Sequence, residues 1–118
     1  MFLGKIDKVI VGTDRVTSDA VFNKIGTYLV ALAAKENNIP FYVAAPTSTL
    51  SLNETISDVT IEQRDSREVS HVLGKLQIVP EGVDCLNYAF DITPFKLVTG
   101  IITEHGVFSP NELLERYK

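Results

Sequence analysis

The first apolar run of the chain indicates a buried strand. Residues 8–13 (KVIVGT) are apolar without alternation and rich in β-branched side chains. A strand covered on both faces, as in a parallel sheet, has this continuous pattern. We therefore predict a strand at residues 8–13 that is buried on both faces.

The hydrophobic period then changes to the three- and four-residue spacing of an amphipathic helix. Thr17 or Ser18 is expected to cap the start of this helix, and Asp19 to lie in its first turn. The helix is expected to end at residues 37–38. The apolar positions that follow the helical spacing are Val21, Ile25, Tyr28, Leu29 and Leu32.

A second buried strand follows this helix. Pro40 leads into residues 41–45 (FYVAA), which are again apolar without alternation. A strand, a helix and a second strand in this order form a βαβ unit with parallel strands and a right-handed connection. The sequence therefore predicts one α/β domain over residues 1–118 with a mainly parallel sheet.

The second half of the chain has shorter elements. Asp65 with Glu68 three residues later resembles a helix start, which predicts a short helix at 66–71. Residues 76–79 (LQIV) and 83–87 (VDCLN) are interpreted as short strands.

Two helices are predicted near the end of the chain. Thr93 and the proline after it have the order of a cap and a first helical residue, and Gly106 would end this helix. Ser109 and its following proline repeat that order, with Glu112 three residues after the cap. We expect helices at 94–105 and from residue 110 onward.

Composition removes several classes of function. The net charge is −4 and the positive charges are scattered, which argues against binding to nucleic acid or an anionic membrane surface. No apolar stretch approaches the ~20 residues of a membrane span. Cys85 is the single cysteine, which permits no internal disulfide and no cysteine-based zinc site. We expect a cytoplasmic protein without a metal or cofactor.

Polar side chains gather where the two predicted strands end. Asp14 follows the first strand and residues 46–49 follow the second, and ligands of open α/β sheets bind beyond such carboxyl ends. Asn23 and Lys24 lie near the predicted helix start, whose free N–H groups favour phosphate or another anion. A carboxylate in such a cleft can act as a general acid or base.

Each of these residues also has a structural interpretation. Asp14 could cap its own loop or pair with Arg15, Lys24 could be a solvated helix residue, and Asn23 could be a second cap. The sequence contains no Walker loop, no Gly-x-Gly-x-x-Gly and no Gly-x-Ser-x-Gly motif that would decide between the interpretations.

At these residues the sequence resembles a known family. Residues 9–52 closely resemble the C-terminal domain of the methylthioribose-1-phosphate isomerases, and the similarity continues through TIEQRDSREV and NYAFDITPFKLVTGIITEHGV. This superfamily includes ribose-1,5-bisphosphate isomerase and the alpha, beta and delta subunits of the eukaryotic translation initiation factor two B. The resemblance implies a Rossmann-like, three-layer αβα fold with a mainly parallel sheet, here truncated.

The resemblance also implies a reaction. In the isomerases, the acid that matches Asp14 is the catalytic general acid/base, and the pair that matches Asn23 and Lys24 holds the substrate. The implied reaction converts an aldose 1-phosphate into a ketose 1-phosphate in methionine salvage, without a metal or cofactor. The alternative is a non-catalytic binding or regulatory module, because the initiation-factor subunits keep the fold without the chemistry.

The family proteins are considerably longer than this chain. The resemblance implies that the missing part carries the arginines that grip phosphate and a catalytic cysteine, a position that Cys85 does not match. Half of a doubly wound sheet would leave an edge strand and apolar faces open. We therefore expect the chain to pair with a second copy or with a separate chain that supplies the missing part, and to bind a sugar phosphate.

Overall fold

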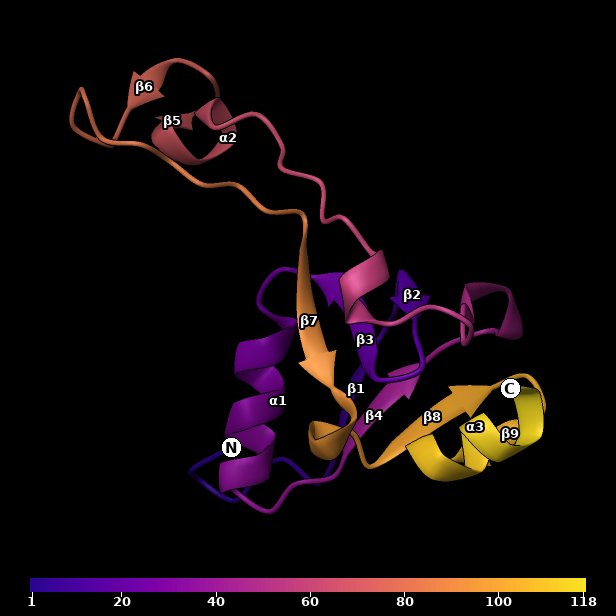
Figure 1. Ribbon diagram of the computed structural model, residues 1–118. Coiled ribbons are helices and arrows are strands. Elements are labelled where there is room, and N and C mark those ends of the chain that lie inside the picture. The colour runs from indigo at the N-terminus through magenta and orange to yellow at the C-terminus, as the bar shows by residue number, and fades with distance from the viewer.

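A four-stranded sheet forms the centre of the protein (Figure 1). The computed structural model describes all 118 residues. β4 (Phe41–Ala44) lies between β1 (Val9–Val11) and β8 (Gly100–Thr103) and is parallel to both, while β9 (Gly106–Phe108) pairs antiparallel with β8. The predicted α/β class with a mainly parallel sheet is confirmed.

A second sheet and two helices cover one face of the central sheet. β2 (Arg15–Val16), β3 (Ala20–Lys24) and β7 (Phe90–Pro94) form an antiparallel sheet in that order. α1 (Thr27–Glu36) packs against β7 and β4, and α3 (Pro110–Tyr117) packs against β8 and β9.

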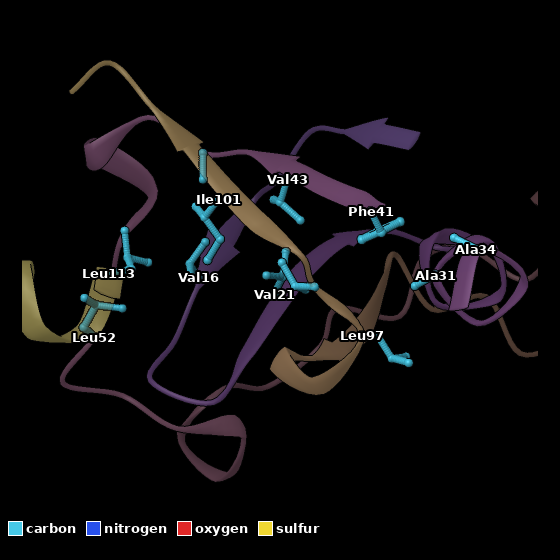
Figure 2. Close-up of a cluster of buried hydrophobic side chains, with 12 residues drawn as sticks. Val16, Val21, Ala31, Ala34, Phe41, Val43, Leu52, Leu97, Ile101 and Leu113 are labelled. Atoms are coloured by element: carbon cyan, nitrogen blue, oxygen red, sulfur yellow. The ribbon is translucent and has the colours of Figure 1, made fainter. Parts of the chain in front are cut away.

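The core lies between these layers (Figure 2). Alternate side chains of the central sheet, Phe41, Val43 and Ile101, are at most 1% exposed. Val21 of the second sheet and Leu113 of α3 pack into the same cluster. Full burial of each large apolar side chain contributes about 1.5–3 kcal/mol, so this one cluster holds the layers together.

The opposite face of the central sheet is open. Ile10 points to that face and is 60% exposed, and Val107 of β9 is 56% exposed. The Tyr42 ring lies across Gly100 on this face, where a Cβ would approach the ring to 2.9 Å. The expectation that β1 is buried on both faces is therefore wrong, because β1 is an edge strand and no helix of this chain covers this side.

Residues 63–88 leave the body as an arm (Figure 1). The arm carries α2 (Arg67–Ser70) and a hairpin of β5 (His71–Val72) and β6 (Leu76–Gln77). The predicted helix at 66–71 is thus confirmed and the strand at 76–79 is confirmed in part, whereas residues 83–87 form no strand.

Other helix predictions have mixed outcomes. α1 ends at Glu36 with Asn37 as its C-cap, as expected, but its predicted start at residues 17–19 is wrong, because residues 20–24 form β3. The helix predicted at 94–105 is wrong as well, since this segment contains the end of β7, η3 (Phe95–Leu97) and β8. The final helix is confirmed, with the predicted capping box of Ser109 and Glu112.

The open face and the arm give the chain an expanded surface. Its radius of gyration is 16.6 Å, compared with about 13 Å for a compact chain of this length. Its accessible surface of 7640 Å² exceeds by roughly 1,300 Å² the value expected for a compact protein of its mass. None of the helices has the length and apolar character that a membrane span requires.

Candidate functional site

Asp14 lies in the loop that follows β1, at the carboxyl end of that strand. Its N–H donates to the Phe22 carbonyl at 2.8 Å, which ties the loop to β3. The Thr13 hydroxyl reaches both the Phe22 and the Arg15 carbonyls at 3.1 Å. Thr13 therefore fixes the backbone on both sides of Asp14, a role that the sequence analysis missed.

Asp14 borders a hollow of about 220 Å³. Phe22 and Phe90 are among the residues that line it, together with residues 58–62. The hollow is smaller than the ~300–1,000 Å³ of a typical ligand pocket. This hollow by itself is thus too small to enclose a typical ligand.

The Asp14 carboxylate has no hydrogen-bond or ion-pair partner in the chain. The cation that the sequence offered as its partner, Arg15, instead pairs with Glu54 at 3.1 Å. Both structural interpretations of Asp14, as a loop cap and as the partner of Arg15, are therefore wrong. Its carboxylate remains free to meet a ligand.

The charge around the hollow is mainly negative. Asp14, Asp58 and Glu62 contribute three carboxylates, and Arg15 is the one cation. Because Arg15 is already paired with Glu54, this hollow has no free positive charge for a phosphate. The lining of this hollow is therefore acidic, and carboxylates of this kind can take part in proton transfer.

Asn23 and Lys24 lie on a strand, not at the start of a helix. In the pairing of β3 with β7, Lys24 stands opposite Phe90 and Asn23 opposite Asp91. Lys24 therefore shares the face of the Asp14 hollow, whereas Asn23 faces α1 and donates to the Thr27 hydroxyl at 3.0 Å. A ligand that touches both side chains must sit across the end of β3.

The exposed Lys24 side chain makes no ion pair within the chain. Its positive charge acts on the carboxylate of Glu68 in the arm. Hydrogen bonds from Arg64 and Asn87 chiefly lower the pKa of that carboxyl group, and the charge of Lys24 adds a smaller effect. The Lys24 ammonium group is thus available to an anion.

Two N–H groups at the start of α1 already have an acceptor inside the fold. Asp91 of β7 accepts hydrogen bonds from the Gly26 N–H at 2.7 Å and the Tyr28 N–H at 3.1 Å. The expectation that this helix start offers its donors to an anionic ligand therefore fails for these two N–H groups. Asp91 has no local signal in the sequence, because it stands just before the helix predicted at 94–105.

The loop after β4 is also tied internally. Residues 47–49 form a 3₁₀ turn, η1, and both the N–H and the hydroxyl of Thr47 donate to Glu104 beyond β8. The hydroxyl bond is the main cause that lowers the pKa of Glu104 to about 2. Glu104 was hidden from sequence analysis by the helix wrongly predicted across β8.

A second, larger hollow of about 450 Å³ borders Thr47 and Tyr117. Glu54 lines this hollow while its partner Arg15 lines the first one, so the ion pair separates the two. The two strand ends therefore lie at one edge of the sheet, as predicted. They border two separate hollows and not a single site. Cys85 lies on the arm, away from both hollows and only partly buried.

Fold and site together define an α/β protein with an unpartnered acid at the carboxyl edge of its sheet. The sequence model of the initiation factor 2 subunit family matches residues 1–110. The chain belongs to this family.

Relatives carry two kinds of name. The methylthioribose-1-phosphate isomerase of Thermosipho africanus is 59% identical over 112 residues, which cover 93% of this chain and 32% of that protein. The crystal structure of the 5-methylthioribose 1-phosphate isomerase of Pyrococcus horikoshii is 40% identical, with a TM-score of 0.86 over 98% of this chain and 33% of that one.

The crystal structure of the translation initiation factor eIF-2B, subunit delta, from A. fulgidus is 54% identical. It has a TM-score of 0.87 over 92% of this chain and 32% of that one. The chain thus spans about a third of the length of the relatives it matches.

Proposed function

We propose that this chain is the carboxyl-terminal part of a cytoplasmic aldose–ketose isomerase that acts on methylthioribose 1-phosphate. The observation that carries the proposal is the Asp14 carboxylate, unpartnered at the carboxyl edge of the sheet and beside a partly aromatic hollow. The isomerase names of relatives that share more than half of the aligned residues supply the substrate class.

In this proposal Asp14 is the general acid/base. Phosphate on the anomeric oxygen keeps the sugar ring from opening freely, so the reaction needs a proton for the ring oxygen and a hydrogen moved between C2 and C1. A carboxylate can carry such a proton in both directions. Phe22 and Phe90 would limit water at the reacting atoms, while Asn23 and Lys24 hold the substrate across the end of β3.

The activity is proposed to require a partner that supplies the remaining part of the relatives' length. The small hollow, its negative charge and the open sheet face all support this requirement. The excess surface of roughly 1,300 Å² exceeds the ~800 Å² that each partner buries in a standard interface. The partner is either the preceding part of a longer chain or a separate chain, and it would bring the cations for the phosphate.

The test is reconstitution with the part of the Thermosipho africanus isomerase that this chain does not match, about two thirds of its length. The mixture should convert methylthioribose 1-phosphate, and Asp14→Asn should lower kcat by about 100-fold or more. The two chains should still co-elute, because the Asp14 side chain makes no hydrogen bond or ion pair within the fold. Asp84→Asn, an exposed carboxylate on the arm, is the matched control and should leave turnover unchanged. Turnover retained by Asp14→Asn would contradict the role of Asp14.

A non-catalytic, initiation-factor-like module is the second candidate. The 54% identity to the structure named as an eIF-2B subunit favours it. Under this alternative, the wild-type chain would bind its partner without turnover, and Asp14→Asn would leave that binding intact.

A further inference from the structure

The Asp91 carboxylate lies at the N-terminus of α1, where an anion from outside could otherwise bind. Asp91 Oδ2 accepts the N–H groups of Gly26 and Tyr28, at 2.7 and 3.1 Å. Gly26 is the N-cap residue of α1 and lies in the left-handed region at φ 104, which glycine adopts without strain. Gly26 has no side chain to cap the helix, so Asp91 supplies the capping oxygen from another strand.

The same contacts reach the two candidate substrate-binding residues. Thr27, the first residue of α1, donates its hydroxyl to the Lys24 carbonyl at 2.6 Å and accepts from the Asn23 side chain at 3.0 Å. Asp91 also stands directly opposite Asn23 in the pairing of β3 with β7. The first turn of α1 is thus held from two sides, because Asp91 accepts from Gly26 and Tyr28, and Thr27 between them is bonded to the end of β3.

We propose that Asp91 is a positioning residue that fixes the turn after β3 and so orients Asn23 and Lys24. By taking the N–H groups of Gly26 and Tyr28, Asp91 also excludes an outside anion from the start of α1. The substrate part of this inference rests on the proposed function: the phosphate is held by side chains and not by the α1 N-terminus.

The positioning role can be measured on the chain alone by NMR. Asp91→Ala should speed hydrogen exchange at Gly26 and Tyr28 by roughly fivefold or more. It should also shift the side-chain amide signals of Asn23. Asp91→Asn keeps an acceptor oxygen, so it should restore the slow exchange at Gly26 and Tyr28 and the wild-type position of the Asn23 signals. Asn23 signals that stay unchanged in Asp91→Ala would overturn the proposal.

Glu112→Ala is the matched control for lost capping. Glu112 caps α3 by accepting the Ser109 N–H at 2.9 Å, so this variant also loses a cap. It should lower stability to a comparable extent and leave the Asn23 signals in place. An equal shift of Asn23 in both variants would mean that the effect reports general loosening, and would overturn the positioning role.

Inorganic phosphate tests the exclusion of anions. In the wild-type chain, phosphate should not shift the Gly26 and Tyr28 amides, whereas in Asp91→Ala it should shift them in a saturable way. Saturable shifts of these amides in the wild type would overturn the exclusion.

Kinetics of the reconstituted enzyme separate this inference from the proposed function. Asp91→Ala should raise KM for methylthioribose 1-phosphate by about tenfold with a smaller change in kcat, as expected when substrate-binding groups are displaced. Asp91→Asn should recover most of the loss. If the wild-type mixture is inactive, the proposed function fails while the NMR outcome still decides the role of Asp91. If the mixture is active and Asp91→Ala leaves KM unchanged, the positioning role of Asp91 is refuted and the proposed function is not.

Discussion

Two buried threonines allow one substitution to be tested in opposite environments. Thr93 of β7 and Thr17 are both fully buried. The Thr93 hydroxyl has no hydrogen-bond partner, whereas the Thr17 hydroxyl donates to the Asp19 carboxylate at 2.8 Å and to the Ala20 carbonyl at 3.3 Å. The same change to valine should therefore have opposite effects on the free energy of unfolding.

The expected magnitudes follow from the partners. A buried polar group without a partner costs about 1–3 kcal/mol, and valine is favoured in a strand, so Thr93→Val should stabilise the chain by about 1–2 kcal/mol. Thr17→Val breaks a hydrogen bond to a carboxylate and should destabilise it by about 1.5–3 kcal/mol.

Urea unfolding of the two variants and the wild type provides the measurement. The midpoint should rise for Thr93→Val and fall for Thr17→Val at an unchanged slope, which shows that the surface exposed on unfolding is the same. Equal destabilisation by both changes would refute the reasoning, because it would mean that the Thr93 hydroxyl is satisfied.

Two further predictions concern Glu104 and the tip of the arm. The pKa of Glu104 is about 2, below its ordinary 4.5, so its stabilising contribution is present above about pH 4.5 and is lost as the pH falls toward 2. Glu104→Gln cannot accept the Thr47 hydrogen bonds as a charged group, so it should lose less stability over this pH range than the wild type. Acid titrations followed by circular dichroism measure this difference, and parallel curves for the two proteins would contradict it. Leu73 has φ 54 and Gly74 φ 67, the two positive angles that favour Asn-Gly in a type I′ turn. Leu73→Asn should slow hydrogen exchange of the Lys75 N–H by roughly threefold, and unchanged exchange would count against strain at Leu73.

The start of α1 illustrates what local sequence rules cannot detect. The apolar positions Tyr28, Leu29 and Leu32 lie in α1 as predicted. Val21 and Ile25 fit the same period by coincidence, because Val21 belongs to β3 and Ile25 lies before α1 begins. The capping residues predicted at 17–18 are local to the chain. The capping oxygen comes from Asp91, which lies 65 residues after Gly26 and on another strand. A capping rule that considers only neighbouring residues cannot include both Gly26 and Asp91.

Two similar cap signatures had different outcomes for a physical reason. At Ser109, the third residue after the cap is Glu112, whose carboxylate closes a capping box. At Thr93, the third residue is Lys96, which cannot accept the cap N–H. The β-branched residues that follow instead pair with β4, and the helix is replaced by β8. A rule that requires an acid three residues after the cap would have accepted Ser109 and rejected Thr93.

The candidate site was predictable in part. The position of Asp14 after an apolar strand was sufficient to place it at the carboxyl edge of the sheet, and the structure puts it there. The contacts that surround it were not predictable, because Arg15 and Glu54 are separated by 39 residues. Pairings of this kind depend on tertiary packing and not on sequence spacing.

The base of the arm has a consequence for how the length of the chain can change. The arm leaves and returns at one point, where Gln63 bridges Tyr88 and the Ala89 N–H donates to the Glu62 carbonyl at 2.9 Å. The closure entropy of a loop grows only slowly with its length. Residues between these anchors can therefore be gained or lost as one module without changing the register of β7 or the strand order of the body.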